Sequence, residues 1–251
     1  MCSIGRDGEA ADALDASPKP RFFLRAGTAV ATAAALVPRT PAFEIAGRTG
    51  ETSALGPIVL VRVRQPGYIE VAGPPSATAV RRVAATLGAG GRLVLIDGAV
   101  DRLAALRGAD DAIVVAVGAA SAPTPERAAD AAAGLVARLR LRPADPGREC
   151  VEVAGALTAS AAAAFAAASE RRQVVVQDAT HVAFGGRAFL ELNRRLDLRC
   201  RHVLRPVACT VAPRSLERSF DPQDFASLIA QRTGLPVYDV YAGTVTEASA
   251  A

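Results

Sequence analysis

The sequence has little of several residue types that mark particular classes of protein. It contains one lysine, Lys19, two histidines and no tryptophan in 251 residues. Its arginines are scattered in ones and twos, and no basic stripe with interleaved aromatic residues accompanies the formal charge of +4. Such a stripe is the usual footprint of a nucleic-acid interface. We therefore predict no nucleic-acid partner.

The four cysteines form neither a metal-binding nor a disulfide pattern. Cys2, Cys150, Cys200 and Cys209 contain no Cys-x-x-Cys pair. Cys200, His202 and Cys209 are three residues of metal-ligating type, but no fourth ligand is evident. Structural zinc sites need four ligands, and small buried cysteines are the commoner case. We predict no zinc site and no oxidising compartment.

Apolar runs long enough to cross a membrane are also missing. The two longest alanine-rich runs, 26–38 and 159–168, are shorter than the roughly 20 residues that a spanning helix needs. The segment before the first run carries Asp7, Glu9, Asp12 and Asp15, whereas a secretory leader begins with basic residues. We interpret the protein as cytoplasmic, with no membrane partner.

Short apolar strands alternate with helical segments over most of the chain. We predict strands at 21–24, 43–45, 57–64, 68–72, 93–96, 112–119, 150–153, 173–176, 202–211 and 237–241. We predict helices at 28–36, 74–87, 123–139, 158–169, 187–196 and 222–234. Helices between strands favour parallel pairing. The predicted fold is α/β, with a mostly parallel, doubly wound, P-loop or Rossmann-like sheet and a small β-hairpin insertion at 57–72.

The main candidate site is the end of the strand 93–96. Four apolar residues run directly into Asp97 and Gly98, which favours a strand buried on both faces. In open α/β sheets, ligands bind at the carboxyl edge, where nucleotide-hydrolysing proteins present a Mg²⁺ ligand. An ordinary Asp-Gly turn is the alternative interpretation.

Asp178 repeats this arrangement in the second half. Three valines precede it, and Thr180 and His181 follow. If both strands belong to one sheet, Asp97, Asp178 and Thr180 would face the same crevice. If the sheet divides near residue 141, Asp178 becomes the N-cap of the following turn. No serine or cysteine elbow accompanies His181, so it is a weak catalytic candidate.

Several of these stretches, taken in order, carry a family resemblance. They are 3–9 (Ser-Ile-Gly-Arg-Asp-Gly-Glu), 18–21, 26–28 with 30–33, 71–74, 95–99 with 101–102, 118–120, 178–180, and 220–222 with 236–240. In this order the chain resembles the P-loop ATPase-like reactivating factors that accompany adenosylcobalamin-dependent lysine 5,6-aminomutase, an enzyme of lysine degradation.

The resemblance implies a partner, cofactors and site residues. The partner would be the subunits of a cobalamin-dependent aminomutase, and a homodimer is left open. The cofactors would be Mg²⁺ with ATP or GTP. Asp97 would be catalytic and would share Mg²⁺ with Asp7, while Arg6, Gly98, Asp178 and Thr180 would contact the nucleotide.

One departure from the family pattern bears on activity. The sequence contains no Gly-x-x-x-x-Gly-Lys-Ser/Thr loop, and Lys19 precedes a proline. Without that amide cradle and lysine, we expect nucleotide binding to be weak or lost. We therefore expect a truncated or degenerate relative that lacks the N-terminal Walker A segment. Two alternatives stay open: a non-catalytic α/β interaction module, and an unrelated α/β enzyme that uses Asp97, Asp178 and His181.

The domain organisation follows from a polar, proline-rich connector at 141–148. We predict a truncated P-loop-like half at 1–141, which carries the Walker B-like strand, and a second α/β half at 149–243. Residues 244–251 are small and polar, and we expect a frayed tail. One continuous domain is the alternative.

Overall fold

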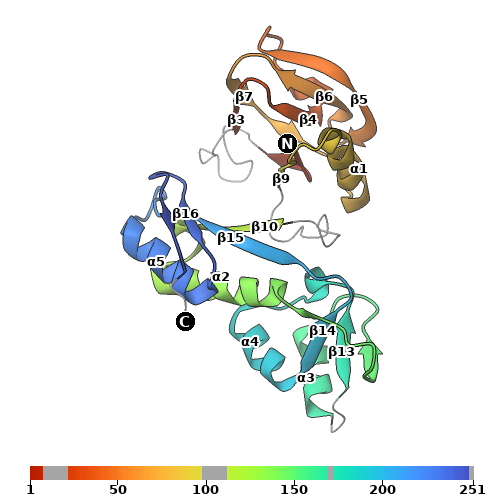
Figure 1. Cartoon of the computed structure of the whole chain (residues 1–251), viewed down its shortest axis with the longest axis vertical. Coiled ribbons are helices and arrows are strands. Elements are labelled where there is room, and N and C mark those ends of the chain that lie inside the picture. Colours follow the sequence, from red (N-terminus) through yellow and green to blue (C-terminus); the bar gives the residue numbers. More distant parts are fainter. Residues whose placement is uncertain (8–21, 98–111, 169–171, 249–251) are drawn as a thin grey trace. The chain divides into compact units, whose positions relative to one another are not determined.

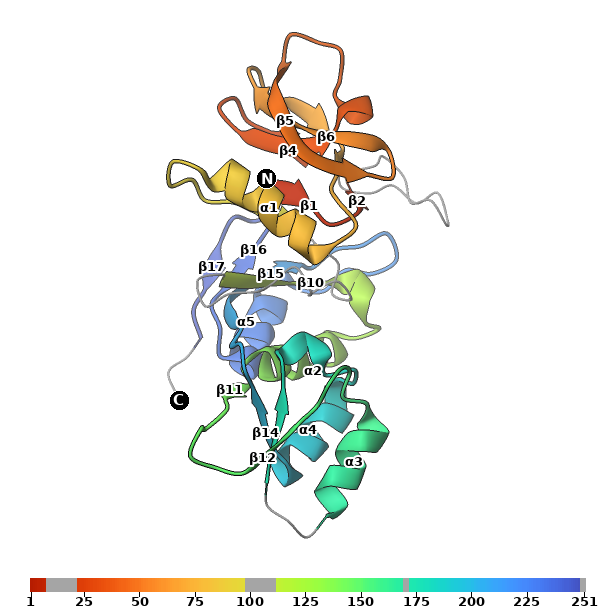
Figure 2. The same ribbon diagram turned by 90° about the vertical axis from the view of Figure 1, so that its right-hand side faces the viewer.

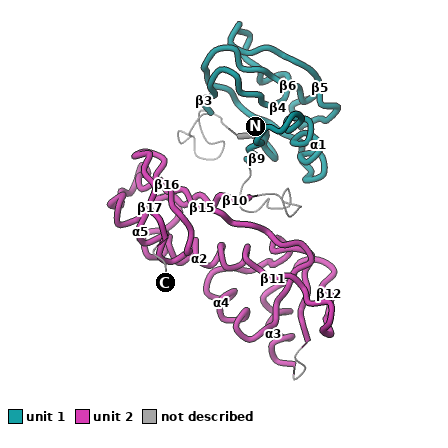
Figure 3. Tube along the Cα trace, in the orientation of Figure 1, with its two compact units in different colours: residues 1–106 teal, residues 107–251 magenta. Residues whose placement is uncertain are grey.

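The computed structural model describes residues 1–7, 22–97, 112–168 and 172–248 (Figure 1). These residues form a mixed α/β fold with five α-helices and several parallel sheets, so the predicted α/β class is confirmed. The chain divides into two compact units, Met1–Leu106 and Arg107–Ala251 (Figure 3). The connector 141–148, where we predicted a division, lies inside unit 2. Gly98 lies outside the described residues.

The main sheet of unit 1 is antiparallel and has the strand order β4-β6-β5. Its strands are β4 (Ala29–Ala33), β5 (Phe43–Ser53) and β6 (Gly56–Val63). The predicted helix 28–36 is therefore wrong: Val30 and Thr32 of β4 are fully buried, and only Ala34–Leu36 forms a 3-10 turn. Alanine has the highest helix propensity, but propensity is a weak determinant of structure, and pairing with β6 outweighs it here.

The predicted hairpin at 57–72 does not form, because β6 is the central strand and both of its edges are already paired. The returning chain therefore pairs elsewhere. The strand β7 (Gly67–Ile69) pairs with β3 (Phe22–Leu24), and β8 (Val71–Ala72) pairs with β2 (Arg6–Asp7).

A two-stranded parallel sheet joins the start of the chain to Asp97. It consists of β1 (Cys2–Ser3) and β9 (Ile96–Asp97). The helix α1 (Ala77–Gly88) precedes β9 and packs against β1, with Val80 and Val83 in a core that includes Cys2 (Figure 2). This helix confirms the prediction for 74–87.

The predicted burial of strand 93–96 on both faces is wrong. Leu93 is 90% exposed and Leu95 is 63% exposed. Within the described residues, β9 pairs only with β1 and has two residues. A strand buried on both faces needs layers on each side of its sheet, and apolar sequence alone does not supply them.

The first sheet of unit 2 has the order β10-β15-β16-β17. Its strands are β10 (Ala112–Gly118), β15 (Arg205–Ala212), β16 (Val237–Asp239) and β17 (Val245–Thr246). The first three are parallel, whereas β17 is antiparallel and lies within the predicted frayed tail. The helices α2 (Pro125–Leu139) and α5 (Pro222–Thr233) pack against each other and this sheet.

The second sheet of unit 2 has the order β11-β14-β13-β12, and all its pairs are parallel. Its strands are β11 (Arg142–Pro143), β12 (Cys150–Glu152), β13 (Gln173–Val176) and β14 (Asp197–Cys200). The helices α3 (Ala159–Ala167) and α4 (Gly186–Arg195) pack against each other, and α4 contacts β14. Every residue of β13 is buried, as its valines predict.

No helix among the described residues combines the length and apolar character that crossing a membrane requires.

Candidate functional site

Asp97 lies at the carboxyl end of the parallel pair in unit 1. Its register partner on β1 is the fully buried Ser3, and the amide of Ile4 donates to the Asp97 carbonyl oxygen at 3.1 Å. The Asp97 side chain is half-buried and makes an interaction of its own. The sequence thus positions a carboxylate at the carboxyl edge of this parallel pair, as we predicted.

Asp7 and Arg6 follow the same edge. After Ser3 the chain turns at Gly5, which has a φ of 90°, and enters β2. There Arg6 pairs with Ala72 and Asp7 pairs with Val71. The topology places Asp7 a few residues beyond the β1 end that Asp97 flanks. Their shared contact with one Mg²⁺ stays a prediction.

Gly73 makes this edge unusually tight. Its amide donates to the Gly5 carbonyl oxygen at 2.7 Å. A Cβ atom at position 73 would lie 1.6 Å from the Ser3 carbonyl oxygen. Only glycine allows the backbone to pass so close to the strand that neighbours Asp97.

Asp178 has a structural role in unit 2. It follows β13, is 2% exposed and caps the 3-10 turn Ala179–His181. Its Oδ1 accepts hydrogen bonds from the Thr180 amide at 2.8 Å and the Thr180 hydroxyl at 2.5 Å, and it lies 3.2 Å from His181 Nδ1. The N-cap interpretation is therefore confirmed. Asp97 and Asp178 belong to different sheets and different units.

Cys200 lies next to Asp178 at the same end of this sheet. It is the register partner of Val176 and is 1% exposed. Burial, reinforced by the negative charge of Asp178, raises the pKa of the Cys200 thiol to about 11. Because the thiolate is the reactive form, this thiol is a poor nucleophile at neutral pH.

His202 and Cys209, the other candidate metal ligands, do not form a metal site with Cys200. His202 is exposed, and its amide donates to the Gln177 carbonyl oxygen at 2.9 Å. Cys209 is buried in the other sheet, and burial raises its pKa. In the described part of the chain, no cluster of three or more histidine, cysteine, aspartate or glutamate side chains could hold a metal ion.

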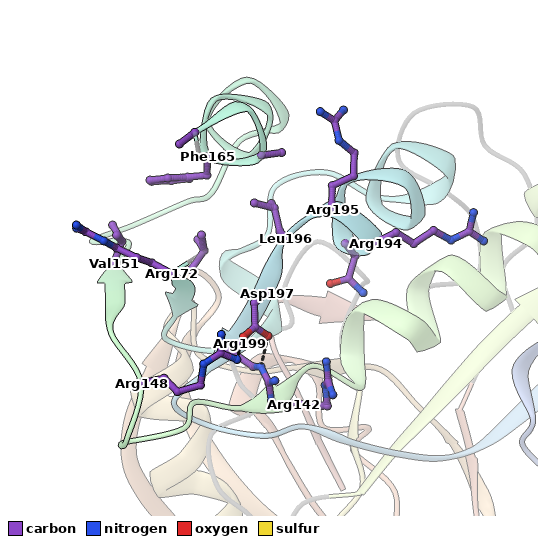
Figure 4. Close-up of a pocket in the computed structure, with 14 residues that line it drawn as sticks. Arg142, Arg148, Val151, Phe165, Arg172, Arg194, Arg195, Leu196, Asp197 and Arg199 are labelled. Carbon is purple, nitrogen blue, oxygen red and sulfur yellow. Dashed lines mark hydrogen bonds and ion pairs between the residues drawn. The ribbon is translucent and has the colours of Figure 1, made fainter. Parts of the chain in front are cut away.

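An arginine-lined cleft of about 980 Å³ lies at the opposite, amino-terminal edge of the same sheet (Figure 4). Its arginines are Arg142, Arg148, Arg172, Arg194, Arg195 and Arg199. Asp197 is the one acidic residue among the described residues that line it. We call this feature the arginine cleft.

The strand order explains why these arginines gather. Arg142 is the first residue of β11, Arg172 directly precedes β13, and Arg148 shortly precedes β12. Arg194 and Arg195 end α4, just before β14. Because the four strands are parallel, their amino ends share one edge. The sequence alone shows these residues as scattered, and only the pairing of the four strands brings them together.

Ion pairs order the centre of the arginine cleft. Asp197 accepts hydrogen bonds from Arg148 at 2.7 Å and from Arg199 at 2.6 Å, and Arg142 lies near this group in Figure 4. Arg172 lies 3.4 Å from Glu149. Two guanidinium groups thus share one carboxylate, and the lining keeps an excess of positive charge. Such a surface attracts anions.

The opposite wall of the arginine cleft is apolar. It includes the half-buried side chains of Val151, Phe165 and Leu196, which Figure 4 shows on the side away from Arg142. Ligand clefts commonly combine apolar walls with a few charged groups. The arginine cleft therefore suits an anion that also has an organic part.

Comparisons of the chain with protein-family models, curated proteins and solved structures gave no match.

Proposed function

We propose that the chain is a relative of the cobalamin-dependent aminomutase reactivating factors and acts by binding its partner rather than by hydrolysing nucleotide. The ordered stretches that carry the resemblance support the kinship, since they run from residue 3 to residue 240. A cytoplasmic location belongs to the same proposal.

The observation that carries the proposal is the position of Asp97 beside Ser3 at the carboxyl end of β1 and β9. Parallel strands that end in a carboxylate are the arrangement that nucleotide-hydrolysing proteins use at this edge. We also propose that the fold derives from a doubly wound, P-loop-like sheet. The helix α1, which precedes the parallel strand β9, supports this ancestry.

A bound nucleoside triphosphate does not fit the residues present at this edge. Carboxylates such as those of Asp97 and Asp7 are the oxygen ligands that Mg²⁺ prefers. However, the sequence has no Gly-Lys-Ser/Thr loop to surround the phosphates with amides and a lysine charge. We therefore assign no hydrolytic step to the chain.

The remaining candidate groups also favour binding over catalysis. The Asp178 carboxylate is occupied by Thr180, and the raised pKa of Cys200 keeps its thiol protonated. Hydrogen bonds to buried polar groups of this kind stabilise the fold.

Surface plasmon resonance with purified lysine 5,6-aminomutase tests the proposal. We expect a complex without added nucleotide, with an affinity that Asp97→Asn leaves unchanged. The Asp97→Asn variant is matched in size and removes only the charge. No complex at micromolar enzyme, or a complex that forms only with Mg-ATP, would contradict the proposal. Sedimentation of the same sample reports whether the chain is a homodimer.

A further inference from the structure

We propose that the arginine cleft of unit 2 is a metal-independent binding site for a polyphosphate group. This inference does not depend on the proposed partner, because it rests only on the arginine cleft itself. It also concerns a different sheet edge from that of Asp97, in a different unit.

Three of the six arginines are explained by neighbouring parts of the fold. Arg194 and Arg195 are the last residues of α4, where basic side chains stabilise the negative end of a helix dipole. Arg172 faces Glu149 at 3.4 Å. The other three arginines, Arg142, Arg148 and Arg199, gather around Asp197 (Figure 4).

These three arginines keep unused donors. Each guanidinium group has five N–H donors in a planar fork. Arg148 gives one to Asp197, whereas Arg199 gives one to Asp197 and a longer one, at 3.4 Å, to the Pro143 carbonyl oxygen. The guanidinium group of Arg142 has no hydrogen-bond or ion-pair partner among the described residues, and this residue is exposed. Donors therefore remain for an incoming anion.

The fixed geometry favours phosphate oxygens. Asp197 holds both neighbouring guanidinium groups at hydrogen-bond distance, so part of their side-chain freedom is lost before a ligand arrives. Arg199 is further restrained by burial, with 16% of its side chain exposed, whereas Arg148 is 47% exposed and accessible. Paired, oriented guanidinium groups bind phosphate oxygens in the bidentate manner that makes arginine a common phosphate ligand.

The size and charge of the arginine cleft indicate more than one phosphate. A single phosphate would use a small part of a cleft of about 980 Å³. The three arginines around Asp197 exceed its charge by two, three positive against one negative, which favours a ligand with more than one phosphate. Because this charge is already present in the protein, the ligand needs no Mg²⁺ to neutralise it.

Calorimetry with inorganic tripolyphosphate in EDTA tests the site. We expect binding that Arg142→Ala with Arg148→Ala weakens about tenfold or more, because two charge-assisted contacts are lost. The matched control removes two exposed arginines of the same unit outside the arginine cleft, Arg127→Ala with Arg187→Ala, and should change the affinity less than twofold. Equal weakening by both pairs would overturn the proposal, since it would show general charge attraction. Thermal unfolding of each variant checks that its fold is kept.

Two further arms identify the source of the phosphates. In the first, the affinity for ATP is measured in EDTA. A higher affinity for ATP than for tripolyphosphate, if Phe165→Ala removes the difference, would support a nucleotide held against the apolar wall. Tripolyphosphate that binds at least as tightly as ATP would support a polyphosphate chain. Binding that requires Mg²⁺, or an acidic peptide that binds where tripolyphosphate does not, would contradict the proposal.

Discussion

The two units present carboxylates at the carboxyl ends of parallel strands in different ways. In unit 1, Asp97 ends a two-residue strand and stays half-buried. In unit 2, Asp178 follows the fully buried strand β13 and is occupied by the turn that it caps. The same sequence pattern, an apolar run followed by aspartate, therefore gives a half-buried aspartate in one unit and a buried, capping aspartate in the other. The arginine cleft lies at the amino-terminal edge of the sheet that contains β13, opposite the edge that Asp178 follows.

The largest effect should come from Gly73→Ala, which tests whether the Asp97 edge of unit 1 is as tight as described. The new Cβ would meet the Ser3 carbonyl oxygen at 1.6 Å, so the backbone must move. We expect a loss of about 3 kcal/mol or more in the free energy of unfolding, at the upper end of overpacking effects. Urea unfolding, with hydrogen exchange of unit 1 amides, measures this loss.

Gly47→Ala is the matched control for that experiment. A Cβ at position 47 would meet only a Leu60 side-chain atom, at 3.9 Å, which is ordinary contact. We expect a change of less than about 1 kcal/mol. Equal effects of the two substitutions would show that the close approach at Ser3 is not a constraint.

The second effect concerns Asp178 and sharpens the contrast between the two carboxylates. Asp178→Ala removes the carboxylate that accepts hydrogen bonds from the Thr180 amide and hydroxyl, both of which are part-buried. We expect a destabilisation of about 2 to 3 kcal/mol. Asp221→Ala, which removes the exposed N-cap of α5, should cost about 1 kcal/mol. A stable Asp178→Ala protein that loses partner binding would instead make Asp178 functional.

The third prediction is a pH dependence that comes from unit 2. The folded protein holds the Cys200 proton more tightly than the unfolded chain does, because burial and Asp178 raise its pKa to about 11. The resulting stability is complete below the ordinary pKa of a thiol and is lost as the pH rises from about 9 towards 11. We expect wild type to lose about 2 kcal/mol more than Cys200→Ala over this range. Parallel curves for the two proteins would contradict the assignment.

Thiol labelling gives a smaller and simpler test of the same burial pattern. Cys150 is exposed, whereas Cys2, Cys200 and Cys209 are buried. At neutral pH we expect iodoacetamide to modify Cys150 first, and Cys150→Ser to remove the fast phase. Mass spectrometry identifies the modified residue. Rapid modification of Cys200 in the folded protein would contradict the description of its surroundings.

Local signals made the helices of unit 2 predictable from the sequence. Thr124 caps α2, while Asp221 followed by Pro222 starts α5, and Gly234 ends that helix with a φ of 63°. The valines before Asp178 correctly predicted the buried strand β13. Each of these features depends on residues that are near in sequence, which is why sequence reasoning recovered them.

Unit 1 and the arginine cleft depend on distant pairing, which sequence periodicity does not report. The alanine-rich residues around Val30 form a strand because β6 pairs with them, and Leu93 is exposed because β9 has one partner among the described residues. The arginines come together only through the order β11-β14-β13-β12. Neither arrangement has a signal within a short window of sequence.

Binding of Mg-ATP tests most directly the central proposal, which is that the chain binds its partner and neither binds nor hydrolyses nucleotide at Asp97. Calorimetry and a phosphate-release assay should use Arg142→Ala with Arg148→Ala, so that the arginine cleft does not contribute. We predict no Mg²⁺-dependent heat at millimolar Mg-ATP or Mg-GTP, and no hydrolysis above a blank, because the phosphate loop is missing. Micromolar Mg-ATP binding that disappears when Asp97→Asn is added would contradict the account.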